Sequence, residues 1–194
     1  FAALQEEVRK LIGVPGVSIG ITPFFFFHDR FVFSAIHSEN SLFLKNLHTQ
    51  EEKETASDGL RKHFIKNPAP LVITGITDEA LLSYSFINHL RAQGWNGLIV
   101  CPLRNYNQLI GVLEIASSEE GILNDDILMK VDSVLPLFEL AVNRTWSSLD
   151  AQIDKIIKEQ FTAIQPAVEW RFVEGALNFL LGKEEDEDAK MEPI

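Results

Sequence analysis

The stretch 97–117, GLIVCPLRNYNQLIGVLEIAS, constrains the fold more than any other part of the chain. Two apolar runs, 98–103 and 109–116, flank a polar group at 104–108 whose asparagines favour turn geometry. The pattern predicts a β-hairpin. Its strands show little alternation of apolar and polar residues, which is typical of a sheet with helices on both faces. We therefore expect this hairpin at the centre of a covered sheet.

The rest of the chain alternates between helical and extended patterns. Ser41, Thr77 or Asp78, and Asn124 are suited to begin helices, because their side-chain oxygens can accept bonds from first-turn N–H groups. Pro136 should kink the long helix in which it lies. We expect helices over 1–12, 42–47, 51–66, 79–93 and 124–164, another after Pro166, and strands over 17–27, 31–36 and 71–76, the first two paired antiparallel.

The most apolar positions of the hairpin and its neighbours predict the core. It should contain Leu98, Val100, Leu109, Val112, Leu113 and Ile115, together with Phe86, Leu90, Val134 and Phe138. Four consecutive phenylalanines at 24–27 leave two interpretations open, because they could fill the core or line an apolar pocket. Adjacent strand residues face opposite sides, so alternate rings at most could line one cavity.

Composition limits the classes of partner. The chain of 194 residues has a formal net charge of −11, which disfavours non-specific binding to nucleic acid or to an anionic membrane surface. The single cysteine, Cys101, excludes an intrachain disulfide and favours a cytoplasmic setting. No apolar run reaches the ~20 residues that span a bilayer. Because the chain begins at Phe1, we expect a piece of a longer protein.

A strand carrying Pro102-Leu103, a short polar turn, the segment IGVLEI at 110–115 and a following helix together resemble the GAF family of small-molecule sensor domains. The resemblance covers about residues 1–146 and implies an α+β (α/β sandwich) fold, with a central antiparallel sheet of five to six strands and helices on both faces. A C-terminal helical extension over 147–182 and an acidic tail or linker over 183–194 would follow. The related PAS fold is the alternative, although it is shorter and normally lacks the long opening helix.

The same resemblance implies a non-catalytic regulatory domain of a larger, bacterial-type signalling protein. An unidentified small molecule would be its ligand, and an output domain would lie in the same full-length chain. The Asn-Lys-x-x-Phe signature of cyclic-nucleotide binding is absent, and the placement of Cys101 inside a strand disfavours bilin attachment. No cofactor is expected. Polar residues near the place where the fold admits ligands are Thr74, Tyr84, His89 and Arg104, although Arg104 could equally be a solvated hairpin residue.

Two further functions remain open beside sensing. Residues 16–20, GVSIG, match the G-x-S-x-G pattern of serine hydrolases, which would make Ser18 a nucleophile. The surrounding order argues against it, because the pattern needs a strand before the serine and a helix after it. The other function is a ligand-free dimerisation module. The five histidines, His28, His37, His48, His63 and His89, show no metal-ligand spacing, so no metal is expected.

The long C-terminal helix carries an apolar stripe that suggests a partner. Val142, Trp146, Leu149, Ile153 and Ile156 recur at alternating spacings of four and three, which is the seam of a coiled coil. The stripe outruns the domain, and it predicts a parallel homodimer through the terminal helices. The alternative is that these residues pack on the opening helix or beneath the helix after Pro166.

Overall fold

The computed structural model describes residues 2–27, 30–32 and 39–160. The predicted hairpin is confirmed as β5 (Gly97–Asn105) and β6 (Gln108–Ser117). Its turn is reduced to Tyr106 and Asn107, and Tyr106 has a positive φ of 53°. β6 also pairs with β1 (Val17–Pro23), and β5 pairs with β4 (Leu71–Ile73), all antiparallel. The hairpin therefore forms the two inner strands of a sheet with the order β1-β6-β5-β4.

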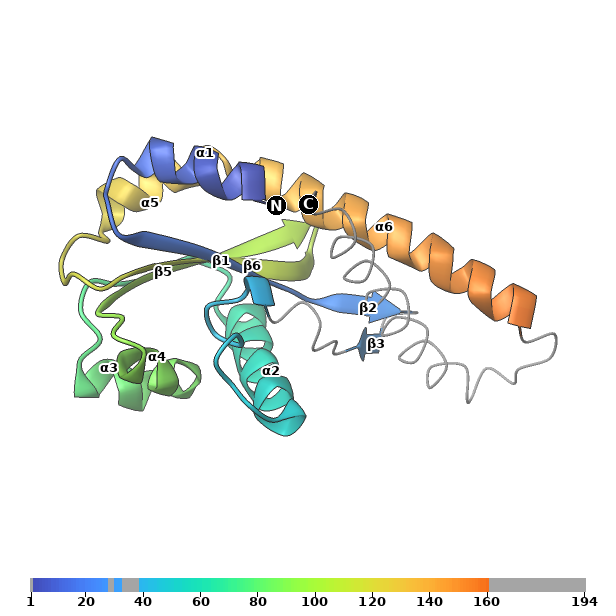
Figure 1. The fold of residues 1–194 in the computed structure, drawn as a ribbon, viewed down its shortest axis with the longest axis horizontal. Helices are drawn as coiled ribbons and strands as arrows, with labels where there is room; N and C mark the ends of the chain where they lie inside the picture. The colour runs from blue at the N-terminus through green and yellow to red at the C-terminus, as the bar shows by residue number, and fades with distance from the viewer. Residues whose placement is uncertain (1, 28–29, 33–38, 161–194) are drawn as a thin grey trace, which may run out of the picture.

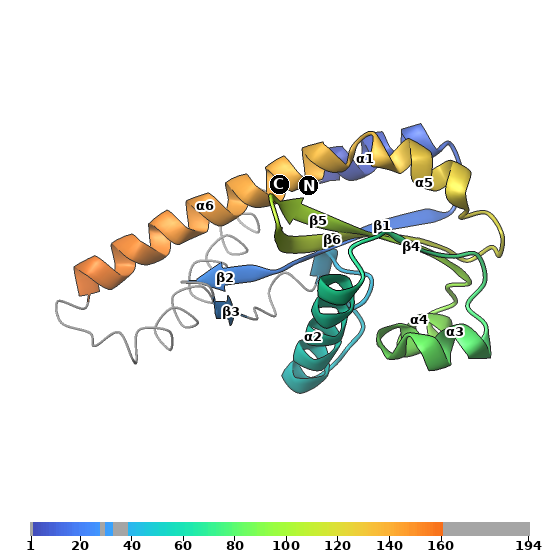
Figure 2. The ribbon, with the colours of Figure 1, turned by 180° about the vertical axis from the view of Figure 1, so that it is seen from behind.

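Helices lie on both faces of this sheet, as predicted (Figures 1 and 2). One face is covered by α1 (Ala2–Ile12), α5 (Asp125–Asp132) and α6 (Leu135–Gln160). The other carries α2 (Gln50–Lys66), α3 (Asp78–Ser83), the 3-10 turn η2 (Ser85–Ile87) and α4 (Asn88–Ala92). The mixed α+β class is thus confirmed. No helix among the described residues is long and apolar enough to cross a membrane.

The core consists of two clusters, one on each face of the sheet. Because side chains alternate along a strand, Leu113 of β6 joins the cluster under α1, α5 and α6, whereas Val112 joins the cluster under α2 and α4. Of the ten predicted core residues, nine are buried and Val134 is partly buried. The apolar runs of the hairpin lack alternation because both faces are covered.

The sheet differs in size from the expectation of five to six strands. The described residues contain six strands, but they form a four-stranded sheet and a separate pair, β2 (Phe25–Phe27) with β3 (Arg30–Val32). The expected single strand over 17–27 ends at Pro23, and the next residue, Phe24, turns its side chain into the cluster under α2. The phenylalanines thus point to different sides, and Phe25 stacks on Trp146 of α6 instead.

Two predicted helices are interrupted. The helix expected over 79–93 breaks at Tyr84, whose backbone (φ −132°, ψ 80°) is not helical, into α3, η2 and α4. The helix expected from Asn124 stops at Asp132, before Pro136, and α6 restarts at Leu135. Proline is tolerated in the first turn of a helix, so Pro136 lies just inside α6 and does not kink a continuous rod.

Residues 42–46 form turns, so the helix predicted over 42–47 is absent. Ser41 does behave as a cap, since its hydroxyl accepts a bond from the N–H of Leu44 at 3.1 Å. Its hydroxyl also bonds to Glu114 on the neighbouring strand at 3.1 Å, and the N–H of Leu42 bonds to the same carboxyl. Tertiary bonds to Glu114 thus replace the local helical ones.

The apolar stripe of α6 is not exposed as the predicted seam. Val142, Leu149 and Ile153 are 8%, 3% and 0% exposed within the single chain, and the Trp146 ring lies 5.4 Å from that of Phe25. Ile156, the last residue of the predicted stripe, is half-buried. The stripe is therefore covered within the single chain as far as Ile153, which corrects the predicted placement of a dimer seam there. Its continuation beyond residue 160, the helix after Pro166 and the acidic tail lie outside the described residues.

Candidate functional site

The beginning of α2 fixes a carboxylate at one end of a cavity. Thr49 is the N-cap, and its hydroxyl accepts the N–H of Glu52 at 3.1 Å. In return, one Glu52 oxygen, Oε2, accepts the N–H groups of Thr49 at 3.0 Å and His48 at 3.1 Å, which completes a capping box. These backbone bonds, that of Thr49 above all, lower the pKa of Glu52. Glu52 is therefore an oriented carboxylate at neutral pH.

The interrupted helix opposite supplies the other wall. The break at Tyr84 allows Phe86 and His89 to face α2 from η2 and α4. The Phe86 ring is buried and packs edge-on against Phe43, with ring centroids 5.8 Å apart. Burial lowers the pKa of His89, while a hydrogen bond to the backbone of Phe43 opposes that shift. His89 is therefore neutral at pH 7, and its Nε2 is buried without a hydrogen-bond partner.

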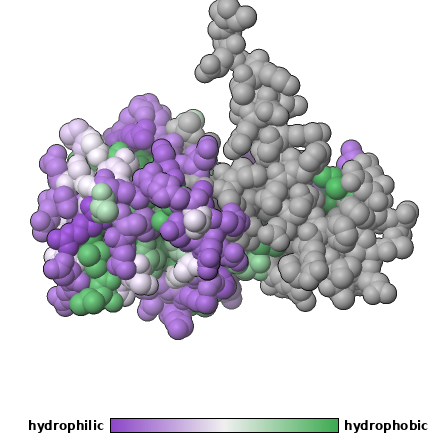
Figure 3. All heavy atoms as spheres, turned by 60° about the horizontal axis from the view of Figure 1, so that its bottom comes forward, coloured by the Kyte–Doolittle hydropathy of each residue, from purple (hydrophilic) through white to green (hydrophobic). Residues whose placement is uncertain are grey.

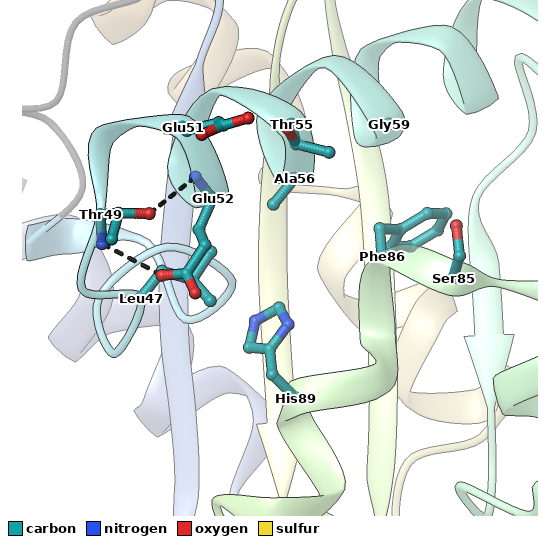
Figure 4. A pocket seen from close by; sticks show the side chains of 10 residues that line it. All are labelled: Leu47, Thr49, Glu51, Glu52, Thr55, Ala56, Gly59, Ser85, Phe86 and His89. Atoms are coloured by element: carbon teal, nitrogen blue, oxygen red, sulfur yellow. Dashed lines mark hydrogen bonds between the residues drawn. The ribbon is translucent and has the colours of Figure 1, made fainter.

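A cavity of about 560 Å³ lies between these walls (Figure 4). Its walls belong to the sheet face opposite α6 (Figure 1). Figure 3 shows this side of the molecule, where the coloured surface is mostly hydrophilic with small apolar patches. The volume lies within the range of roughly 300 to 1,000 Å³ that small-molecule sites occupy. The lining residues come from α2, the turn before it, η2 and α4: Leu47, Thr49, Glu51, Glu52, Thr55, Ala56, Gly59, Ser85, Phe86 and His89.

Of the four residues predicted to bind a ligand, the structure brings His89 alone to this cavity. Thr74 is exposed after β4, where its carbonyl accepts the N–H of Gly121 at 2.8 Å. Tyr84 is half-buried and packs against the His63 ring, with centroids 5.4 Å apart. Neither side chain lines the cavity, so a ligand role for Thr74 or Tyr84 stays a prediction.

Arg104 lies outside the cavity and joins two helices across the sheet. Its guanidinium donates to the carbonyl of Phe64 near the end of α2 at 2.9 Å, and its backbone N–H donates to Glu139 of α6 at 2.9 Å. The next residue, Asn105, bonds through its side-chain amide to Asn143 of α6 at 2.9 Å. The end of the hairpin thus connects a cavity wall to the long helix. A ligand role for Arg104 also stays a prediction.

Sequence reasoning missed the acidic and hydroxyl groups of the cavity. Thr49 and Glu52 did carry a local signal, because Thr-x-x-Glu before a helix is a capping box. That signal locates the helix start but not a cavity. Ser85 and Thr55 carry no comparable pattern. They meet only because α2 and the broken helix pack on the same face of the sheet.

A second group of polar side chains is buried next to the central strand. Glu114 of β6 is 0% exposed, and its carboxyl oxygens accept bonds from the hydroxyl of Thr22, the hydroxyl of Ser41 and the N–H of Leu42. Burial raises the pKa of Glu114 to about 7, although these donors partly offset the shift. Gly20 leaves room for the carboxyl because it lacks a Cβ, which would lie 2.6 Å from Oε2 of Glu114. The group ties the segment before α2 to the sheet.

A smaller cavity of about 230 Å³ lies between β1, β2 and α6. Its polar lining consists of two side chains, Asn40 and Thr145, and the remainder is apolar. It therefore offers fewer groups for recognition than the larger cavity.

Two of the chemical possibilities raised by the sequence, the Ser18 nucleophile and metal binding, can be compared with the described part of the structure. Ser18 lies inside β1, which continues to Pro23 and is not followed by a helix, so the strand-serine-helix order of a nucleophile elbow is missing. Over 2–27, 30–32 and 39–160 there is no group of three or more histidine, cysteine or acidic side chains that could hold a metal ion. Comparison with known protein-family models and with curated proteins gives no match for this chain.

Proposed function

We propose that residues 1–146 form a GAF-type sensory domain, which binds a small molecule without chemical turnover in the cavity between α2 and α4. The observation that carries the proposal is the 560 Å³ cavity, which combines an oriented carboxylate, hydroxyl groups and the unpartnered Nε2 of His89 with an apolar wall. Ligand sites have this composition, since a few fixed polar groups within apolar surroundings orient a bound molecule. The proposal keeps the cytoplasmic setting that the single cysteine predicts.

A binding event must alter α6 if the domain is to regulate an output domain. The bonds of Arg104 support such a connection, because they join the end of α2 to Glu139 of α6. A ligand that binds one arrangement of α2 better than another would bias this connection, and a ligand without that preference would transmit nothing. The cavity, the hairpin end and α6 are thus the three parts of the proposed sensor.

Filling the cavity is expected to abolish ligand binding. Ala56 lines the cavity from α2, and the change Ala56→Trp would place an indole in that space. A panel of cationic, neutral and anionic small molecules would be screened by thermal unfolding. A compound at about 100 times its Kd should stabilise the wild type by about 2.7 kcal/mol and leave Ala56→Trp unchanged.

The matched control is Ala92→Trp, because Ala92 is exposed at the end of α4 and does not line the cavity. It should respond to ligand like the wild type. Native mass spectrometry of the purified protein would add a search for a co-purifying compound. The proposal is wrong if no compound of any charge class stabilises the wild type, or if Ala56→Trp still responds.

The proposal includes a second copy of the chain, held through the terminal helices. The buried stripe of α6 cannot form the dimer interface. On the opposite side of α6, however, Leu137 is 52% exposed and Leu140 is 56% exposed. The double change Leu137→Lys, Leu140→Lys should convert a dimer to a monomer, because like charges would face each other across a symmetric interface. Light scattering after gel filtration measures this, with Leu82→Lys, 89% exposed on α3, as control. A wild type that is monomeric at tens of micromolar would exclude the dimer.

A further inference from the structure

We propose that the cavity between α2 and α4 takes a small organic cation that donates N–H hydrogen bonds, of the chemical class of a primary ammonium attached to an apolar body. This inference rests on the proposed function, because it takes the cavity as the ligand site. It adds the charge and the hydrogen-bonding character of the ligand.

The charge of the lining favours a cation. No lysine or arginine lines the cavity, whereas Glu51 and Glu52 both do. Neither carboxylate takes part in an ion pair within the described part of the chain. The N-terminus of α2 carries the equivalent of about half a positive charge, which two full negative charges outweigh. An anionic ligand such as a phosphate would therefore be repelled.

The hydroxyl groups of Thr55 and Ser85 can either donate or accept, whereas the free position on Glu52 can only accept. Glu52 uses Oε2 for the N–H groups of His48 and Thr49, and this leaves Oε1 without a bond among the described residues. Figure 4 shows the Glu52 carboxylate and the His89 ring directed into the same space from opposite walls. A carboxylate can only accept, so a ligand that bonds to it must donate.

The hydrogen bond between His89 and the backbone of Phe43 determines whether the other imidazole nitrogen of His89 is a donor or an acceptor. This bond raises the pKa of His89, as expected when a ring N–H donates to a carbonyl oxygen. In a neutral imidazole one nitrogen carries the proton, so the remaining nitrogen, Nε2, is an acceptor. Nε2 is shielded from solvent and has no partner in the described structure. A ligand N–H would satisfy this acceptor once the side chains that shield Nε2 move aside.

The apolar lining suits the body of such a molecule. Leu47 and Ala56 contribute aliphatic surface, and Phe86 contributes an aromatic ring. Aromatic ring faces attract organic cations in addition to burying apolar surface. The three features together match a compact ammonium compound with a hydrocarbon or aromatic part.

Three probes of nearly equal shape and different charge test the inference. They are 2-phenylethylammonium, neutral 2-phenylethanol and anionic 3-phenylpropanoate, titrated into the full chain at pH 7 by calorimetry and by NMR. We expect the ammonium to bind at least ten-fold more tightly than the alcohol, and the carboxylate to show no binding.

The change Glu52→Gln should weaken ammonium binding at least ten-fold. Glutamine preserves the capping box because its side-chain oxygen still accepts backbone N–H groups, so α2 is retained. The matched control is Glu54→Gln, which also removes one negative charge from α2 at an exposed position outside the cavity lining. Its affinity for the ammonium should change less than two-fold. Circular dichroism would verify that both variants are folded.

The outcomes separate this inference from the proposed function. If the alcohol or the carboxylate binds as tightly as the ammonium, or if Glu52→Gln binds normally, the cation class is wrong. If the alcohol or the carboxylate binds and Ala56→Trp abolishes that binding, the cavity remains the ligand site although the cation class is wrong. If the ammonium does not bind while another compound of the panel does, the inference fails alone. If nothing binds, the inference and the proposed function fail together.

Discussion

Replacing Leu113 by alanine is expected to lower the free energy of unfolding by about 2 to 5 kcal/mol. Leu113 is 0% exposed in the middle of β6, where it pairs with Ile21 of β1 and Cys101 of β5. Its side chain belongs to the cluster beneath α1, α5 and α6. Alanine would leave a cavity between rigid elements that cannot collapse fully. A loss of this size is a large fraction of the stability of an ordinary domain.

Chemical denaturation of the wild type and the variant measures this loss. The control is Leu82→Ala, since Leu82 is 89% exposed on α3 and should change the stability by less than about 0.5 kcal/mol. A loss below about 1 kcal/mol for Leu113→Ala would contradict the central position of β6 in the fold, because replacing a fully buried leucine by alanine usually lowers the free energy of unfolding by more than this.

Replacing Glu114 by glutamine is expected to remove a pH dependence of stability of about 3 kcal/mol. The folded pKa of Glu114 is raised from 4.5 to about 7 by burial, so the folded state binds a proton more tightly than the unfolded chain does. The resulting stabilisation is fully present below about pH 4.5 and is lost as the pH rises through about 7. The groups that bond to the carboxyl, from Thr22, Ser41 and Leu42, are all neutral donors.

The difference in unfolding free energy between wild type and Glu114→Gln isolates this group from the other carboxylates. The unfolding free energy of the wild type minus that of Glu114→Gln should be about 3 kcal/mol larger at pH 4.5 than at pH 8. Glu119→Gln, at an exposed position, is the control and should show a constant difference. A constant difference for Glu114→Gln as well would mean that its carboxyl is not buried as the structure places it.

Local patterns in the sequence determined the elements whose signals lie within a few residues. The hairpin follows from two apolar runs and a polar turn, and Asn124 begins α5 as predicted, with its side chain accepting the N–H groups of Asp126 and Ile127 at 3.1 and 3.2 Å. Such features were predictable because the hydrogen bonds that define them join neighbouring residues. The predicted core was also largely confirmed, since the apolar runs of β5 and β6 are buried on both faces.

The candidate site was much less predictable. Of the four proposed ligand residues, His89 alone lines the cavity, because its position depends on the break at Tyr84 that divides the expected helix. The periodicity of α6 likewise identified an apolar face without showing what covers it. In the structure Trp146 stacks on Phe25, a residue far away in the chain, so the stripe is internal.

The sequence by itself thus determined the mixture of helices and strands, the central hairpin and the apolar positions, because these depend on local hydrogen bonding and on periodicity. Only the tertiary structure decided that Thr22 and Ser41 meet Glu114, which is 92 residues from Thr22 in the chain. The same holds for Glu52 and His89, which face one cavity from separate helices. Contacts of this kind arise from the packing of elements on a shared face of the sheet, and no local pattern encodes which side chains that packing brings together.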